Sequence, residues 1–276
     1  MNYYCLVAGL PDLRPDDMKG LLSPKELFDE LNPQLSPADQ LNFRLLMAKY
    51  DNQNFLTYLS NKEADLNPDG LLSRDDWEYL IKLMDENDHP SDPLLMPYWV
   101  RYYQLNHEEE IDAKGITRED YLAGLYFNYA MKSDTAFLKQ WFEFNLNLNN
   151  LLIAILCRKH ELDAAKSVIG SNEIATILRT THSRDYGLSG IFDQLELVLR
   201  ISEEPNLMDR EKKLDALRWN WLEEHTFFNY FTIEKVLAFV LKSEMLNRWK
   251  LLSFEKGEAV FRELLDTIKQ GVQLQE

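Results

Sequence analysis

The chain has 276 residues, of which 45% are apolar and 28% are charged, as in folded proteins with a sizeable core. Its formal net charge is −16, so nucleic acid is excluded as an expected partner because no surplus of Lys and Arg exists to neutralise phosphates. The acidity is uneven: residues 1–134 carry 25 acids and 12 bases, whereas residues 135–276 carry 21 and 18. The second half is therefore better suited to a partner of mixed charge.

Cysteine usage and the N-terminal sequence indicate a reducing compartment. Cys5 and Cys157 lie far apart in the sequence and resemble ordinary apolar side chains, so a disulfide has no support. The N-terminus lacks the basic start and the long apolar core of a signal peptide. The longest apolar run, Leu151–Cys157, is far shorter than the roughly 20 residues that span a bilayer. We expect a cytoplasmic protein that reaches a membrane only through a complex.

Helix-start signals punctuate the chain from residue 23 onward. Ser23–Glu26 combines a serine cap, a proline in the first turn and a glutamate placed for a capping box, and Ser36–Asp39 repeats the signal. Further starts are predicted at Asp51, Ser73, Thr117 and Ser133. Together with apolar periodicity, they predict helices over residues 37–49, 51–60, 76–84, 94–105, 121–131, 133–145, 151–160, 161–169, 172–179, 191–201 and 209–225.

The longest amphipathic pattern runs from Phe231 to Arg262, and a last helix is predicted at about 253–270. Apolar residues recur there at three- and four-residue steps, and no glycine interrupts the pattern before Gly257. The apolar arc is wide, so we expect this helix to be packed on more than one side. No segment alternates apolar and polar residues with period two. The predicted fold class is therefore all-α.

Residues Asp65–Asp76 have the ligand spacing of an EF-hand loop. Oxygen-bearing side chains occupy loop positions 1, 3, 5, 9 and 12, with a glycine at position 6 and an apolar residue at position 8. One interpretation is a calcium-regulated helical binding protein that uses this loop. The other is a polar turn followed by a helix capped at Ser73.

Other chemical motifs are missing from the sequence. It contains neither the phosphate-binding GxxxxGK[ST] nor the dinucleotide-binding GxGxxG. Cys157 and His160 lie one helical turn apart, but a zinc site needs three or four ligands and no second pair is in reach. We therefore expect no catalytic residue, no cofactor and no metal ligand, and we predict a non-catalytic protein.

Aromatic residues make up 12% of the chain and concentrate in four segments: 97–103, 126–131, 137–144 and 218–231. Most are expected in the core. Tyr and Trp at such density also suit a protein that clamps a partner helix, because their large apolar rings carry an O–H or N–H group that can form a hydrogen bond.

Three segments echo one another loosely: 42–49, 150–158 and 234–242. Each has a polar start, an apolar helical run and then a cation. A threefold internal repeat is one interpretation. The other is that amphipathic helices resemble one another, since no fixed period links the three segments.

One of these regions resembles a known family. The helix with Lys242, Glu244 and Asn247 is similar to the last-third helix of the C subunit, called d in eukaryotes, of V-type and A-type rotary ATPases. In that family a lysine is followed by a glutamate and, three residues later, an asparagine. The opening segment, residues 3–13, is similar to that of a shorter bacterial branch of proteins associated with these ATPases.

A second segment is similar to the middle motif of the same family. Asn147 and Asn150 lead into a run of leucines that ends at Arg158, as an Asp or Asn and an Asn do in the family. The resemblance implies that these three residues and Lys242, Glu244 and Asn247 are motif positions.

The resemblance also implies a fold and a role. The fold is a single all-helical domain over residues 1–276, funnel-like, with three pseudo-equivalent units at about 1–134, 135–204 and 205–276. The role is a non-catalytic central-stalk subunit on the cytoplasmic face of the inner membrane. Its partners are the shaft subunits and the membrane proteolipid ring, in a complex that transports protons or sodium ions.

Overall fold

A computed structural model describes residues 2–15, 20–107 and 116–251 of the chain. Every regular element in these residues is a helix, so the predicted all-α fold is confirmed. The chain divides into two compact units: residues 37–221 form a large unit, and residues 1–36 join residues 222–276 in a terminal unit. The expected three-unit division has other boundaries and stays a prediction.

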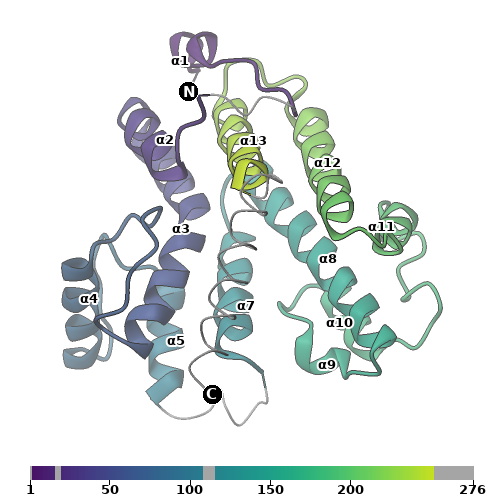
Figure 1. The fold of residues 1–276 in the computed structure, drawn as a ribbon. Coiled ribbons are helices and arrows are strands. Elements are labelled where there is room, and N and C mark those ends of the chain that lie inside the picture. The colour runs from purple at the N-terminus through teal and green to yellow at the C-terminus, as the bar shows by residue number, and fades with distance from the viewer. Residues whose placement is uncertain (1, 16–19, 108–115, 252–276) are drawn as a thin grey trace, which may run out of the picture. The chain divides into compact units, whose positions relative to one another are not determined.

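The large unit is a helical bundle in which neighbours along the chain also pack in space (Figure 1). Its helices are α3 Pro37–Ser60, α4 Arg74–Glu86, α5 Pro97–His107, α7 Arg118–Ala130, α8 Ala136–Lys159, α9 Ala164–Ser167, α10 Glu173–Thr180, α11 Leu195–Ser202 and most of α12 Leu207–Thr226. Helix α3 packs against α4 and α7, and α7 also contacts α5 and α8. Helix α8 in turn contacts α9, α10 and α11.

Aromatic rings fill two parts of the large unit. Phe55 of α3 stacks on Trp77 of α4 with ring centres 5.3 Å apart, and Trp77 meets Trp99 of α5 edge-on at 5.0 Å. In the second cluster Phe144 of α8 stacks on Trp221 of α12 at 5.4 Å. All five rings are buried. Most of the aromatic segments therefore build core, as expected, and each pair adds about 0.5–1.5 kcal/mol beyond its buried area.

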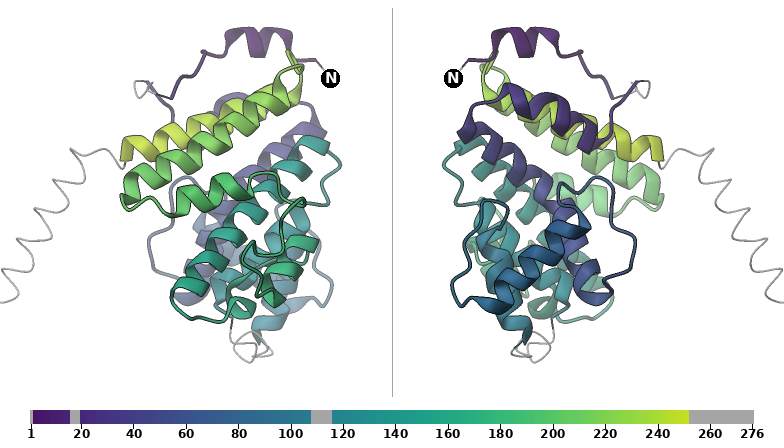
Figure 2. Two further views of the ribbon diagram at one scale, coloured as in Figure 1. Left: turned by 90° about the vertical axis from the view of Figure 1, so that its right-hand side faces the viewer. Right: turned by 90° about the vertical axis from the view of Figure 1, so that its left-hand side faces the viewer.

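The terminal unit joins the two ends of the chain. It contains α1 Tyr4–Gly9, α2 Pro24–Leu31, the short 3-10 helix η1 Asn32–Gln34, the last turn of α12 and α13 Ile233–Leu251. Helix α2 lies across α13 (Figure 2). The backbone N–H of Tyr3 donates to the carbonyl of Phe231 at 2.6 Å, and the Tyr3 hydroxyl accepts the N–H of Ser36 at 3.0 Å. The first bond attaches the N-terminal segment to the turn that precedes α13, and the second attaches it to the residue that precedes α3.

The helix starts at Ser23, Ser73 and Thr117 are confirmed. Each side chain accepts the backbone N–H three residues ahead, and Ser23 and Ser73 also form full capping boxes with Glu26 and Asp76. Such caps contribute about 1 kcal/mol each. The start predicted at Ser133 is wrong by two to three residues, because α8 begins at Ala136.

Two predicted helix breaks are wrong. Asp51 was expected to cap a new helix, and the sequence pattern divided residues 133–160 before Leu151, but α3 and α8 each run without interruption for 24 residues. Asp51 and Asn150 are buried in mid-helix, and their side chains bond to loops instead of to their own backbone. Asn and Asp are poor helix formers because of such backbone competition, and a partner elsewhere removes that competition.

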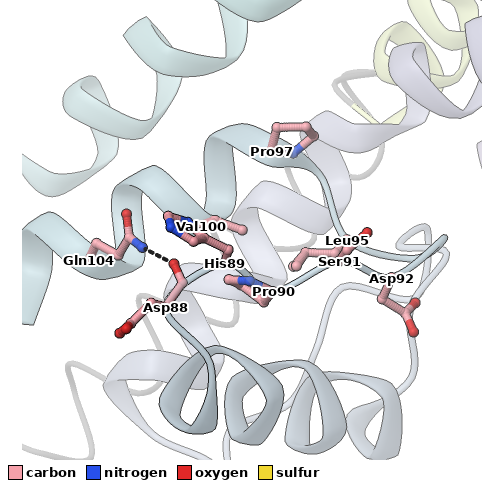
Figure 3. A pocket seen from close by; sticks show the side chains of 9 residues that line it. All are labelled: Asp88, His89, Pro90, Ser91, Asp92, Leu95, Pro97, Val100 and Gln104. Atoms are coloured by element: carbon pink, nitrogen blue, oxygen red, sulfur yellow. Dashed lines mark hydrogen bonds between the residues drawn. The ribbon is translucent and has the colours of Figure 1, made fainter.

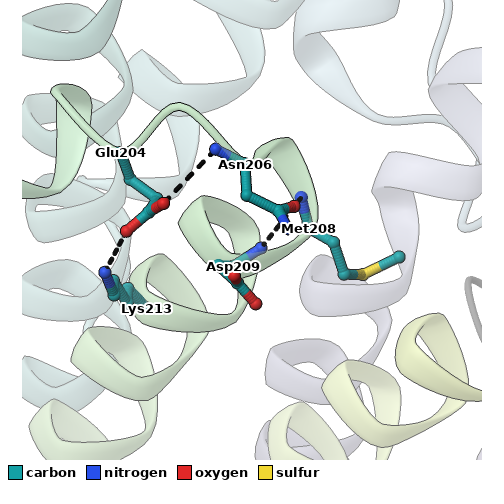
Figure 4. Close-up of polar contacts among 5 residues, drawn as sticks. All are labelled: Glu204, Asn206, Met208, Asp209 and Lys213. Atoms are coloured by element: carbon teal, nitrogen blue, oxygen red, sulfur yellow. Dashed lines mark hydrogen bonds and ion pairs between the residues drawn. The ribbon is translucent and has the colours of Figure 1, made fainter.

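The α11–α12 connection is organised by side chains around a helix start (Figure 4). Asn206 Oδ1 accepts the N–H groups of Met208 (3.0 Å) and Asp209 (3.4 Å). Glu204 accepts the N–H of Asn206 at 3.3 Å and forms an ion pair with Lys213 one and a half turns into α12. Helix α12 consequently starts at Leu207, two residues before the predicted start at 209.

The C-terminal half departs from the prediction at helix ends. The helix predicted over 161–169 is reduced to the single turn α9, α11 starts four residues later than predicted, and α13 covers 233–251 of the predicted 231–262. The rest of that pattern and the predicted helix at 253–270 lie outside the described residues. Cys5 is exposed, Cys157 is buried, and both are free. In the described ranges, each helix is too short or too polar to cross a bilayer.

Candidate functional site: three polar helix–loop clamps

Two polar side chains on α3 hold the loop that precedes α4. Oδ1 of Asp51 accepts the backbone N–H groups of Leu71 (2.8 Å) and Leu72 (3.0 Å). One turn further, Asn54 donates from Nδ2 to the carbonyl of Asn67 (3.0 Å) and accepts the N–H of the same residue at Oδ1 (2.6 Å). Both α3 side chains are buried, so they satisfy the polar backbone of the loop inside the protein. We call Asp51 and Asn54 the α3 clamp.

Gly70 lets this loop approach the α3 clamp closely. A Cβ atom at this position would overlap Nδ2 of Asn54 and lie 3.1 Å from Oδ1 of Asp51. The backbone of Gly70 does not have positive φ, so it is space that requires the glycine here.

A second pair, on α8, holds the loop that precedes α10. Asn150 donates from Nδ2 to the carbonyl of Ile169 (2.8 Å) and accepts its N–H at Oδ1 (3.0 Å). Asn147, one turn earlier, accepts a hydrogen bond from Nδ2 of Asn172 at 2.7 Å. Asn172 in turn caps α10 by accepting the N–H of Ala175 at 3.0 Å. We call Asn147 and Asn150, both buried, the α8 clamp.

The loop held by the α8 clamp is fixed from a second direction. Arg179 of α10 donates to the carbonyls of Val168 and Gly170, and burial lowers the pKa of its guanidinium. Gly170 has φ +78°, and a Cβ there would lie 2.8 Å from Cδ2 of Leu146. Both the conformation and the space therefore require a glycine at this position.

A third pair lies on α13 in the terminal unit. Asn247 donates from Nδ2 to the carbonyl of Leu22 at 2.6 Å. Leu22 directly precedes Ser23, the cap of α2, just as the α3 loop ends at the cap of α4. Glu244 is half-buried one turn before Asn247. We call Asn247 the α13 clamp, because it makes the bond to Leu22 in the N-terminal segment; residues 16–19 lie outside the described part.

The three clamps have a regular spacing in the sequence. Asn54, Asn150 and Asn247 follow one another at 96 and 97 residues, and each stands three residues after an acid or an amide. The pattern Lys-x-acid-x-x-Asn, which occurs at 242–247, occurs a second time at 49–54.

Sequence reasoning missed the α3 clamp, although two signals point to it. One is the second Lys-x-acid-x-x-Asn pattern. The other is the tetrapeptide Gly-Leu-Leu-Ser, which occurs at 20–23 and at 70–73, immediately before α2 and α4. The predicted echo of 42–49 with 150–158 and 234–242 aligns these helices in a different register from the clamps.

The other two motif residues fasten helix surfaces to neighbouring segments. Arg158, exposed in the last turn of α8, places its guanidinium carbon 3.6 Å from the ring centre of Tyr186, a cation–π contact. Lys242 is buried in α13 and donates to the carboxylate of Glu223 in the last turn of α12. The structure thus brings Asn147 and Asn150 to one loop, while Arg158 and Lys242 each serve a separate contact.

The Asp65–Asp76 loop uses its side chains to hold its own conformation. Asn67 bonds to Gln53 at 2.9 Å as well as to the α3 clamp, and Ser73 forms the capping box with Asp76. The glycine at position 6 lacks the left-handed conformation with which EF-hand loops make their sharp turn. Within the described residues, no three His, Cys, Asp or Glu side chains gather closely enough to hold a metal ion. The geometry is that of a polar turn followed by a capped helix, and calcium binding by this loop stays a prediction.

Comparison with known proteins gives a family assignment. A family described as proteins of unknown function, DUF2764, matches residues 1–272. The chain belongs to this family. No curated protein and no solved structure matches it. The matched residues include all three clamps.

A hollow of about 320 Å³ lies between the α4–α5 loop and α5 (Figure 3). Asp88 and Asp92 lie at opposite ends of it with His89 between them, and Gln104 donates to the carbonyl of Asp88 at 3.1 Å. Arg44 of α3 donates to two carbonyls of the same loop, those of Pro93 and Leu94, and burial lowers its pKa. The loop is therefore pinned to the core, and its polar side chains do not converge on one point.

The turn between α12 and α13 exposes aromatic side chains beside α1. We call this group the aromatic tip; its members and their exposed fractions are Tyr4 57%, Phe227 64%, Phe228 81%, Tyr230 63% and Phe231 38%. The rings of Tyr4 and Phe231 lie 4.8 Å apart, and those of Phe227 and Phe228 lie 4.9 Å apart. Contiguous exposed rings of this kind are typical of interaction surfaces.

Proposed function

We propose that this protein is a non-catalytic central-stalk subunit of a V-type ATPase, which joins the rotating shaft to the membrane proteolipid ring. The observation that carries the proposal is the set of three clamps at 96- and 97-residue spacing. Two of them, on α8 and α13, contain the motif residues that resemble the C subunit of rotary ATPases.

The clamp spacing supports a plan of three pseudo-equivalent helical units. Each unit has a long helix of 19 to 24 residues, a loop held by that helix and a capped helix that follows the loop. In the terminal unit the loop and α2 come from the other end of the chain. Helix α2 thus follows the loop bonded by α13 as α4 follows the loop held by α3.

The chemistry of the clamps supports a mechanical role. In the large unit the buried side chains of Asp51, Asn54 and Asn150 bond backbone groups of loops, and a bonded buried network makes its surroundings rigid. An adaptor that transmits torque needs such connections, because a yielding loop would absorb rotation of the shaft. In this proposal the protein turns with the shaft on the cytoplasmic side of the membrane and performs no chemical step.

Co-purification with the rotary ATPase tests the proposal. A tagged copy expressed at native level would be isolated from gently solubilised membranes, and its partners would be identified by mass spectrometry. We expect shaft and ring subunits to be enriched over an equally acidic tagged control protein. Recovery should withstand 0.5 M salt because a permanent rotor contact does not depend on surface charge alone.

Two results would reject the proposal. One is a pull-down that contains no stalk or ring subunit from membranes in which the assembled ATPase is demonstrably present. The other is recovery of these subunits that disappears entirely at moderate salt, as expected of an acidic chain that adheres to basic surfaces without a fixed site.

A further inference from the structure

The aromatic tip lies in two segments of the terminal unit that carry no charged residue. Residues 2–11 and 226–233 contain no Asp, Glu, Lys or Arg, although 28% of the chain is charged. About five charged residues would be expected in these 18 positions at the average frequency. Depletion of charge together with enrichment in Phe and Tyr is the composition of the core of a protein interface.

Hydrogen bonds within the terminal unit hold the aromatic tip in place. Tyr3 is buried and bonds through its N–H to the carbonyl of Phe231, while the Oγ1 of Thr226 donates to the carbonyl of Leu222 at 2.7 Å. These bonds fix both the start of α1 and the end of α12. The exposed rings are thus presented on an ordered support, which lowers the entropic cost of binding.

Acidic side chains flank the tip. Glu224 lies in the last turn of α12 and Glu234 in the first turn of α13, against one lysine, Lys235, on the same stretch, while Glu223 is paired with Lys242. With a net charge of −16, a second copy of this chain or a bare anionic bilayer would be repelled. Cytoplasmic loops of membrane proteins carry an excess of Lys and Arg, and they lie at the level where Tyr rings are favoured at a membrane surface.

We infer that the aromatic tip docks on the cytoplasmic loops of a membrane-embedded protein, and, resting on the proposed function, that this protein is the proteolipid ring. The rings of Phe227 and Phe228 insert between apolar groups of those loops, and the acidic flank meets their basic side chains. Tyr4 and Tyr230 keep their hydroxyls at the wet edge of the contact.

Binding to the purified ring tests this inference with a matched pair of variants. The tip variant carries Phe227→Ser and Phe228→Ser. The control variant carries Leu41→Ser and Leu207→Ser, which remove two apolar side chains of 66% and 64% exposure from the large unit. Both should keep the wild-type melting temperature, because every substituted side chain is exposed. The tip variant should bind the ring at least about tenfold more weakly, and the control should bind as the wild type does.

Equal binding of the tip variant and the wild type to the ring would overturn the inference while leaving the central-stalk role in place. The inference would also fall if the wild type bound protein-free anionic vesicles, made of phosphatidylcholine with about 30% phosphatidylglycerol. It would fall as well if sedimentation showed that the wild type dimerises through the tip. If the wild type bound neither the ring nor the assembled ATPase, the proposed function itself would fail.

Discussion

Asn54 and Asn150 stand 96 residues apart and make the same pair of hydrogen bonds. Each uses its amide to bind both the N–H and the carbonyl of a single loop residue, Asn67 in one case and Ile169 in the other. A buried amide paired in this way replaces the water that the loop backbone would otherwise need. Loop and helix are joined at two corresponding points of the large unit.

Replacing either asparagine should destabilise the protein to a similar extent. Asn54→Ala and Asn150→Ala each leave one N–H and one carbonyl of a part-buried loop unpaired, so we expect each to lower the free energy of unfolding by about 2–3 kcal/mol. Gln140→Ala, at an exposed position of α8, should change it by less than about 0.5 kcal/mol. Urea denaturation followed by circular dichroism measures all three, and a similar loss in Gln140→Ala would contradict the clamp interpretation.

Gly70→Ala should be harmful because of Asn54. The added methyl group overlaps an amide that cannot move without losing its bonds to Asn67, so the expected cost is about 2–3 kcal/mol. In an Asn54→Ala background the methyl group has room, and the cost of Gly70→Ala should fall by more than about 1 kcal/mol. Gly9→Ala, which meets nothing within 4 Å, is the control. Additive costs in the double-mutant cycle would show that Gly70 serves another purpose.

Substitutions of the two partners in the Lys242–Glu223 ion pair should destabilise the protein to different extents. Lys242 is 7% exposed, whereas the side chain of Glu223 is 52% exposed. Glu223→Gln leaves a buried ammonium with a weaker partner, while Lys242→Met replaces it with an apolar side chain of similar length. We expect Glu223→Gln to be more destabilising by about 1 kcal/mol, as measured by thermal denaturation. If Lys242→Met were the more destabilising substitution, burial of the Lys242 charge would have no net cost to the stability of the protein.

The start of α12 should weaken in acid. The hydrogen bond from Lys213 is the main cause that lowers the pKa of Glu204 below its ordinary value, and the N–H of Asn206 contributes further. A depressed folded-state pKa means that this contribution to stability is present above the unfolded pKa of about 4.3 and is lost as the pH falls through the lower, folded value. NMR titration of the Glu204 carboxyl should give this low midpoint, and Lys213→Met should move it upward. An unchanged midpoint in Lys213→Met would refute the assignment.

The sequence predicts the helical fold well because the signals for helix starts depend only on residues close together in the sequence. A serine or threonine cap with an acid three residues later needs only its own segment, and Ser23, Ser73 and Thr117 all open helices as predicted. Asp51 carries the same kind of local signal and is misleading, since its carboxylate bonds to residues 20 positions away. A cap and a clamp use the same residue types, so only the tertiary partner separates them.

The candidate site is predictable in part. Asn147, Asn150 and Asn247 are singled out in the sequence as expected motif positions, but the loops they hold are not, because loop contacts depend on the folded chain. Asn54 could have been found from the repeated Lys-x-acid-x-x-Asn pattern. The aromatic tip could not, since the segment 218–231 reads as core and only the fold exposes its last residues.

Native mass spectrometry of the intact rotary ATPase, purified through a tag on another subunit, tests the central claim most directly. A subunit that joins the shaft to the ring lies on the axis of rotation, where the symmetry leaves room for a single copy. The account predicts one copy of this chain per assembled complex, retained together with the shaft when the complex is dissociated in solution. Its absence from the complex, or its presence in several copies per complex, would contradict the account.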